Sequence, residues 1–428
     1  MGERFVKKDE ISNKTLNKTI DLVEYGKELG LEVIEAPDLD TALLIFTGRI
    51  LMPRSDNVEI DELYTDTMQM LSFELCNRTN SLYSSLPKMD LRFNNETNQT
   101  LKSVEDLINN GADAYNNSKY YSAGSYCFGA NVRLSYLILL RKNLSNITIS
   151  DIIHVLEKNI KGIDKKLSTI NIKTITDLES FMAVKERLIE SQELLERAKL
   201  SSSQKEMLYN LAFSSERLNS AIAWLKFLDN RGKVFSFNKE LLENSCKKRL
   251  SEVEEQFQYI GALIPLDIST INQEITSAYN DFNNKFYELC LYKASKAKAE
   301  INTVISSLSI DESQIDTFIS HKLKITKSNI AKETKKGIFP ILGYSYYEYA
   351  DSLKDTDKYS ALLYSEYAME FSNLDIYFKN RERLYFYNFD YGILIVLVSL
   401  SLISFLGGVI ITSKYYKRKK KRKKKISI

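Results

Sequence analysis

The chain has 428 residues, with 59 lysines and arginines against 56 aspartates and glutamates, so its net charge is only +3. Five prolines and 15 glycines leave room for long uninterrupted helices. This near-balance argues against a strongly basic nucleic-acid-binding protein. The length before residue 385 is enough for about two or three ordinary domains.

The N-terminal part predicts a short α/β module. The first ten residues, MGERFVKKDE, are charged and polar, so we expect no signal peptide there. A helix beginning near residue 20 has Gly30 as its C-cap, and LEVIEA at 31–36 alternates as a strand. Asp38 is the expected N-cap of a second helix at 39–46, which Gly48 closes. One strand cannot form a sheet, so we expect an incomplete remnant in residues 1–50.

The fold class predicted for the rest is mainly α. We expect a helical linker region at 51–100 and a helical domain at 101–384. Within that domain, the spacing Tyr121-x-Ala123-x-x-Tyr126-x-x-x-Ala130 recurs as Tyr359-x-Ala361-x-x-Tyr364-x-x-x-Ala368, and 284–301 resembles a third copy. The first two copies each follow a polar turn, a pattern typical of tetratricopeptide-like helical hairpins. An irregular helical bundle stays open as the alternative.

Two long amphipathic stretches lie between these copies, at 178–200 and 206–228. Such apolar faces form either a groove for a partner or the packing surface between neighbouring helices. We expect packing inside one domain.

The segment 385–413 predicts an aromatic belt followed by one transmembrane helix. GILIVLVSLSLISFLGGVIITS, from Gly392 to Ser413, has no charged residue and is long enough for a hydrocarbon core about 30 Å thick. Tyrosines favour the interface with the headgroups. The interfacial aromatic residues are Tyr385, Tyr387, Tyr391, Tyr415 and Tyr416.

The tail at 414–428 is strongly basic and predicts a cytoplasmic C-terminus at the cell membrane, because short basic flanks of a span stay inside. It also suits anionic lipid headgroups. Removing its ten charges leaves residues 1–413 at about −7, so we expect no nucleic-acid partner. The basic residues are Lys414, Lys417, Arg418, Lys419, Lys420, Lys421, Arg422, Lys423, Lys424 and Lys425.

Few residues are candidates for metal or redox chemistry. The two histidines, His154 and His321, lack the spacing of metal ligands, so we expect no metal and no cofactor. The four cysteines form no C-x-x-C pair, and one or two disulfides stay open. They are Cys76, Cys127, Cys246 and Cys290.

The run LVEYGKELGLEVIEAPDLDTALLIFTG, within residues 15–50, resembles the closing segment of the Lon-type serine protease domain in its archaeal membrane-bound branch. That resemblance implies a long helical region and a C-terminal span downstream. The family's catalytic serine and lysine lie upstream of this segment, where the present chain has almost nothing. We therefore carry over no catalytic residue and expect no catalysis by this chain alone.

One serine lies in a sequence similar to the family's catalytic motif, but it follows the closing segment instead of preceding it. Ser122 lies in a Ser-Ala-Gly run, with Lys165 further along. Because a nucleophile needs an adjacent base and an oxyanion pocket, a Tyr- and Ala-rich helix is a poor setting for one.

The sequence thus predicts a non-catalytic, membrane-anchored helical stalk or interaction domain of a Lon-like membrane protease, split from its peptidase domain. An independent single-pass scaffold or adaptor is the alternative. Expected partners are the membrane and either a separate peptidase subunit or protein substrates, and a homo-oligomer stays open. We expect the large domain outside the cytoplasm.

Overall fold

The computed structural model describes residues 7–8, 15–16, 21–36, 39–48, 62–86, 95–142, 144–228, 232–263, 268–310, 312–378, 399, 404–410, 412–414 and 417. The chain divides into two compact units, Met1–Asn57 and Val58–Ile428.

The first unit contains two short helices and one minimal strand pair. Strand β1 (Lys7–Lys8) pairs antiparallel with β2 (Thr15–Leu16), and helices α1 (Leu22–Glu28) and α2 (Leu39–Thr47) follow. Gly30 ends α1 at a φ of +70°, and the next N–H, of Leu31, donates to the carbonyl of Gly26. Gly48 closes α2 at a φ of +66°, while Asp38 lies outside the described residues.

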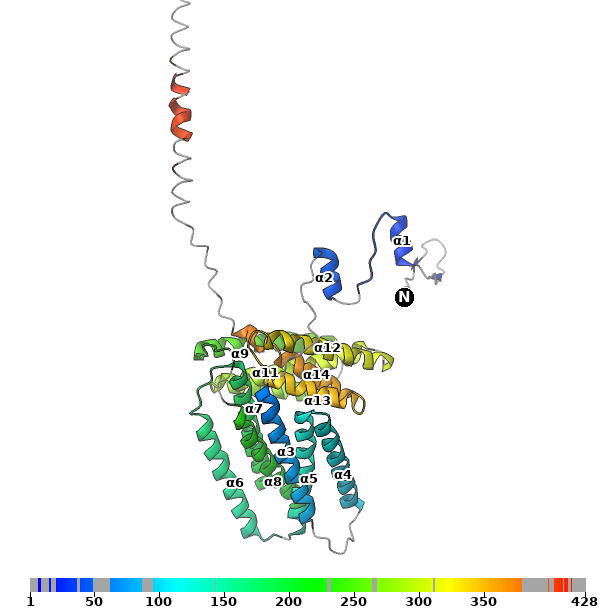
Figure 1. Ribbon diagram of the computed structural model, residues 1–428, viewed down its shortest axis with the longest axis vertical. Helices are drawn as coiled ribbons and strands as arrows, with labels where there is room; N and C mark the ends of the chain where they lie inside the picture. Colours follow the sequence, from blue (N-terminus) through cyan, green and yellow to red (C-terminus); the bar gives the residue numbers. More distant parts are fainter. Residues whose placement is uncertain are drawn as a thin grey trace, which may run out of the picture. The chain divides into compact units, whose positions relative to one another are not determined.

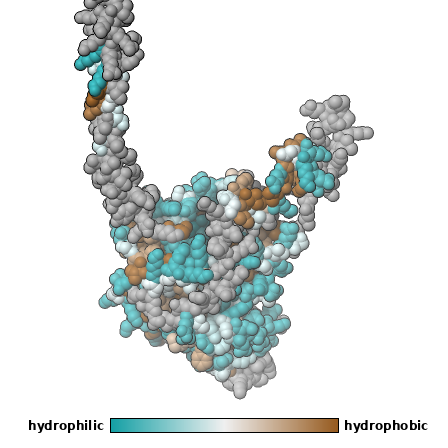
Figure 2. All heavy atoms as spheres, turned by 45° about the horizontal axis from the view of Figure 1, so that its top comes forward, coloured by the Kyte–Doolittle hydropathy of each residue, from teal (hydrophilic) through white to brown (hydrophobic). Residues whose placement is uncertain are grey.

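The strand predicted for 31–36 is wrong, because these residues form no ladder. Alternating apolar residues favour a strand only where a neighbouring strand supplies hydrogen-bond partners. Among residues 21–36 and 41–48, whose burial is described, only Gly26 is buried, and Phe46 is 87% exposed. Hydrophobic side chains accordingly gather on the surface of this unit in Figure 2. The described residues of this unit therefore lack the buried apolar core that an α/β domain has.

The predicted transmembrane helix is also corrected by the structure. Within 392–413, the described residues are 399, 404–410 and 412–413, all helical. No helix in the described part of the chain has the length and apolar character needed to cross a membrane.

The described residues of the second unit form helices joined by loops, with one isolated antiparallel β-bridge between Thr174 and Val234. Its α-helices are α3 (Glu62–Ser85), α4 (Asn95–Asn116), α5 (Tyr120–Arg141), α6 (Asn146–Leu167), α7 (Ile175–Leu200), α8 (Gln204–Trp224), α9 (Lys239–Leu263), α10 (Ser269–Asn283), α11 (Tyr287–Ser309), α12 (Ile315–Thr334), α13 (Ile341–Leu353) and α14 (Lys358–Phe371). Three 3₁₀ turns join them: η1 (Leu225–Phe227), η2 (Glu312–Gln314) and η3 (Leu374–Tyr377).

These helices form two layers (Figure 1). Helices α3 to α8 run lengthwise side by side, and α11 to α14 lie across one end of them. One continuous apolar core joins the layers, from Tyr64 on α3 to Phe378 after α14. At the junction, the ring of Tyr64 lies 5.0 Å from both Phe339 and Tyr344. Burial of these aromatic side chains fixes the layers against each other.

The predicted Tyr/Ala copies each lie in a pair of packed helices, and a tetratricopeptide-like repeat stays a prediction beside an irregular bundle. The two Tyr/Ala copies begin the second helices of the pairs α4–α5 and α13–α14, and the third begins α11 after α10. Ser118 and Lys285 end the first helices at positive φ. The backbone N–H of the residue that follows each of them donates to the carbonyl five residues earlier, as in a Schellman cap. Ala123 and Ala361 are fully buried, so small side chains let the paired helices approach closely.

Helices α7 and α8 pack their apolar faces against neighbouring helices of the second unit, as expected for 178–200 and 206–228. Leu178 and Met182 are fully buried, and Trp224 is 2% exposed. Ser191 on α7 donates to the carbonyl of Ser214 on α8 at 2.8 Å, and Ser214 returns a bond of the same length. These helices therefore form an intramolecular interface.

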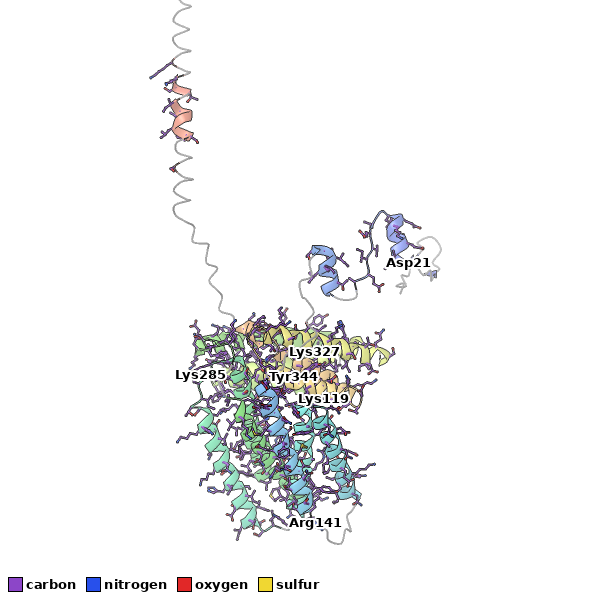
Figure 3. The ribbon with its side chains drawn as sticks, viewed as in Figure 1. Asp21, Lys119, Arg141, Lys285, Lys327 and Tyr344 are labelled. Atoms are coloured by element: carbon purple, nitrogen blue, oxygen red, sulfur yellow. A yellow bond between two sulfur atoms is a disulfide. The ribbon has the colours of Figure 1, made fainter. Side chains whose placement is uncertain are left out.

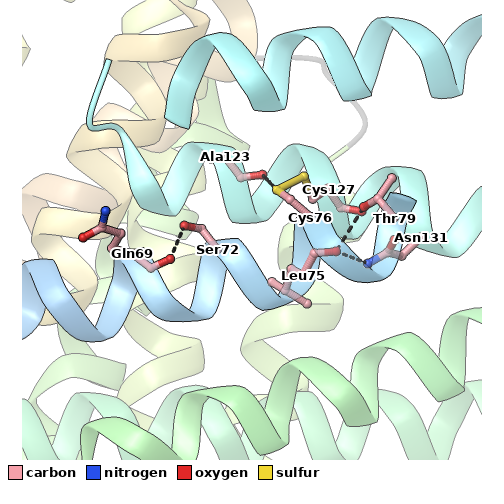
Figure 4. The surroundings of a disulfide bond; sticks show 8 residues. All are labelled: Gln69, Ser72, Leu75, Cys76, Thr79, Ala123, Cys127 and Asn131. Atoms are coloured by element: carbon pink, nitrogen blue, oxygen red, sulfur yellow. Dashed lines mark hydrogen bonds between the residues drawn. A yellow bond between two sulfur atoms is a disulfide. The ribbon is translucent and has the colours of Figure 1, made fainter. Parts of the chain in front are cut away.

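A disulfide stands in each layer. Cys76 on α3 is bonded to Cys127 on α5, and Cys246 on α9 is bonded to Cys290 on α11. Around the first of these, the Thr79 hydroxyl donates to the carbonyl of Cys127 at 3.4 Å (Figure 4). Both disulfides thus covalently tie helices that are also packed together.

Gly343 sets the separation of α13 and α14. A Cβ at this position would lie 2.8 Å from the backbone N of Ser372, which is closer than packed atoms approach. We expect Gly343→Ala to lower the free energy of unfolding by about 1–3 kcal/mol, the usual range for overpacking, in urea denaturation. Gly162 on α6 has open space around it, so Gly162→Ala should raise stability by up to about 1 kcal/mol. Similar effects at both sites would contradict this account.

Candidate functional site

Ser122 lies in the interface between α5 and α13 and is fully buried. Its hydroxyl donates to the carbonyl of Glu348 at 3.2 Å and accepts from the hydroxyl of Ser352 at 2.8 Å. Its backbone N–H donates to Oε1 of Glu348 at 3.0 Å. Lys165 lies in the last turn of α6. The serine hydroxyl is therefore engaged in a structural network that ties the two layers together.

Other charged groups support this junction. Lys119, at the turn before α5, forms an ion pair of 2.7 Å with Asp351 on α13. Glu179 on α7 is fully buried and accepts the N–H of Leu342 in the first turn of α13 at 2.7 Å. Figure 3 shows Lys119 and Tyr344 near the junction and Arg141 at the far end of α5. Glu179 therefore caps the N-terminus of α13, and burial raises the pKa of its carboxyl well above the usual value.

The histidines lie apart on exposed helix positions, His154 on α6 and His321 on α12. The described residues contain no group of three or more His, Cys, Asp or Glu side chains arranged to hold a metal ion.

Most residues predicted at the membrane fall outside the described part. Gly392 and the five interfacial tyrosines (Tyr385, Tyr387, Tyr391, Tyr415 and Tyr416) are among these, as are the basic residues 418–425. Ser413, Lys414 and Lys417 are described as helical and exposed. Their lipid contact stays a prediction.

The structure contains a cavity of about 190 Å³ where the two layers meet. Its walls come from α3, α5, α7 and α8 in one layer and from α13 and α14 in the other. A cavity near 150 Å³ holds a benzene ring, so this one has room for a ring and a small polar group. Its aromatic walls are Tyr121, Phe128, Trp224, Tyr349 and Tyr364.

The charge of the cavity wall is positive. Arg187 and Arg217 line it, and no acidic side chain does. Arg217 forms a close ion pair with Glu190, at 2.6 Å from Nε to Oε2, so its charge is neutralised. Arg187 is 7% exposed and donates from Nε to the Ser220 hydroxyl at 3.1 Å and from Nη1 to the carbonyl of Ala183 at 2.8 Å.

The guanidinium of Arg187 also lies 4.7 Å from the ring of Trp224, which stabilises its charge through the π face. Burial by itself would lower the pKa of Arg187, but the nearby Tyr121 and Glu186 outweigh burial and raise it. Arg187 therefore keeps its proton. Glu186 is itself in an ion pair with Lys296, at 4.0 Å.

The cavity also presents phenolic hydroxyls. Burial is the main cause of the raised pKa values of Tyr121 and Tyr364, and the pKa of Tyr364 rises to about 12. Both therefore stay protonated donors at neutral pH. The rings of Tyr349 and Tyr364 meet edge to face at 4.6 Å and are only partly buried, so the cavity reaches the surface beside them.

Sequence reasoning did not identify this cavity. One signal was present: Arg187 follows Ala183 and precedes Ser191 by one helical turn each, on the same buried face of α7. A charged residue on a buried face indicates a polar partner or a ligand, because an isolated buried charge is costly. The remaining walls come from helices distant in the sequence.

No known protein family, no curated protein and no solved structure matches this chain.

Proposed function

We propose that the helical second unit, Val58–Ile428, is a non-catalytic interaction domain that works in an oxidising compartment, outside the cytoplasm. The observation that carries this proposal is the presence of two disulfides, Cys76–Cys127 and Cys246–Cys290. Disulfides persist in extracytoplasmic proteins, whereas thiols in the cytoplasm are kept reduced.

The proposal that the domain is non-catalytic rests on the contacts of its buried serine and glutamate side chains. Ser122 contacts Glu348 and Ser352 within a helix interface, and Glu179 and Glu348 accept backbone N–H groups. These are contacts that hold helices in place. The cavity, with its aromatic walls and buried guanidinium, is suited to binding.

For the partner, we propose first a separately made peptidase of Lon type, on the basis of the resemblance in residues 20–48. The second candidate is an independent adaptor role. The self-contained core of the unit Val58–Ile428 supports it, because this unit does not depend on another domain for its packing.

The test is thiol labelling of the full chain in the cells that make it. The chain is denatured without reductant and treated with a maleimide polymer that adds mass to each free thiol. We expect no added mass, and four added masses after reduction, because all four cysteines are bonded. Free cysteines before reduction would overturn the proposed compartment. A peptidase activity that is lost in Ser122→Ala would overturn the non-catalytic assignment.

A further inference from the structure

The buried guanidinium of Arg187 has donor capacity left over. A guanidinium carries five N–H donors, and the structure satisfies Arg187 through Nε and Nη1. Its Nη2 has no hydrogen-bond partner among the described residues, and no carboxylate there forms an ion pair with Arg187. Glu186 raises the pKa of Arg187 from nearby but forms no direct ion pair with it, so the remaining N–H groups stay available to an anionic ligand in the cavity.

The cavity next to this charge supplies the other half of a binding site. Trp224 and Tyr121, whose rings lie 6.2 Å apart in an edge arrangement, form an aromatic wall. The hydroxyls of Tyr349 and Tyr364 have no hydrogen-bond partner among the described residues and are available as donors. Met68 and Leu71 add apolar surface from α3. The combination of one anchored cation, free donors and apolar walls fits an anion attached to a flat apolar group.

We propose that this cavity binds a monocarboxylate bearing a single aromatic ring, with the carboxylate on Arg187 and the ring against Trp224 and Tyr121. The ligand is either a free aromatic acid or the C-terminal residue of a peptide. This inference rests on the proposed function as an interaction domain and gives that domain its ligand class. The cavity volume of about 190 Å³ admits a ring with a two-carbon acid.

The experiment is calorimetric titration of the full chain with 3-phenylpropanoate and with the neutral 3-phenylpropanamide. We expect the acid to bind and the amide to bind at least about 10-fold more weakly, since hydrogen bonds to charged groups have this magnitude. A peptide ending in phenylalanine with a free carboxylate, and its amidated form, distinguish the two sources. Tighter binding of the free acid indicates a small molecule, and tighter binding of the peptide acid indicates a chain terminus.

Variants locate the site. Arg187→Met should weaken binding of the acid about 10- to 100-fold. The matched control is Arg78→Met, which removes another guanidinium in an ion pair, with Glu216, away from the cavity, and which should leave binding unchanged. If Arg187→Met does not fold, judged by its circular dichroism, Ser125→Leu tests the same site by filling the cavity without removing a charge. We expect it to abolish binding.

Equal affinity for acid and amide, retention of acid binding in Arg187→Met or Ser125→Leu, or no binding at millimolar ligand would each overturn the inference. These outcomes leave the disulfide-based proposal intact. That proposal fails separately, on free thiols or on Ser122-dependent peptidase activity.

Discussion

Replacing Cys246 and Cys290 together with alanine is expected to lower the free energy of unfolding by about 4 kcal/mol. The bond joins residues separated by 44 positions, and a loop of that length loses roughly this much conformational freedom in the unfolded chain. Both cysteines are fully buried between α9 and α11. Alanine, unlike serine, adds no buried hydroxyl. The change in the free energy of unfolding therefore reflects the lost cross-link and a small loss of packing.

The measurement is urea unfolding of the oxidised protein followed by circular dichroism. Reductant is the internal control: it should destabilise the native chain but not a variant in which all four cysteines are alanine. Cys76→Ala with Cys127→Ala is the matched pair in the other layer, with a separation of 51 positions and a similar expected loss. A Cys246/Cys290 variant as stable as the oxidised native chain would show that this cross-link is not formed.

The helical hairpins were predictable because their signals are local. A buried alanine, tyrosines at helical spacing and a polar turn all lie within about a dozen residues, and Ala123 and Ala361 occupy the expected buried positions. In the third copy, the turn at Lys285 likewise marks the boundary between the two helices. Local patterns decide which residues form a helix and which face is buried.

The N-terminal strand and the membrane-crossing helix were predicted from patterns that are necessary but not sufficient. Residues 31–36 alternate like a strand, but a strand also needs a neighbour with free backbone groups. The apolar composition of 392–413 predicts a span, but no helix among the described residues has the length and apolar character needed to cross a membrane.

The cavity and the disulfide pairing depend on contacts between distant parts of the chain. Arg187 lines the same cavity as Tyr364, 177 positions away in the sequence, and Tyr121, 66 positions away. Four cysteines allow three pairings, and no spacing rule selects Cys76 with Cys127. Such features follow from how helices pack, which a single sequence does not specify.

Glu348→Gln is expected to change how stability depends on pH. Glu348 is 6% exposed, and burial raises the pKa of its carboxyl to about 7, against a usual value of 4.5. Its hydrogen bonds from Ser122 and Tyr121 offset burial only in part. Between pH 4.5 and 7 the native state therefore holds a proton that the unfolded state has released.

The sign follows from proton linkage. A carboxyl whose pKa is raised in the native state contributes stability below pH 4.5, and this stability is lost as pH rises to 7. At about 1.4 kcal/mol per pKa unit, the loss amounts to roughly 3 kcal/mol. A glutamine can still accept the N–H of Ser122 but cannot ionise. We therefore expect Glu348→Gln to match the native chain near pH 4.5 and to exceed it by roughly 2–3 kcal/mol at pH 8.

Urea unfolding at a series of pH values from 4.5 to 8 measures this effect. Glu255 on α9 is exposed, so Glu255→Gln supplies the matched control and should shift stability by less than about 0.5 kcal/mol at every pH. A Glu348→Gln variant that keeps the native slope between pH 4.5 and 7 would mean that Glu348 is not the group that titrates there. Loss of stability at pH 8 would mean that the charged carboxylate is a net stabilising cap of α5, and that its attraction to the helix N-terminus outweighs the cost of burial.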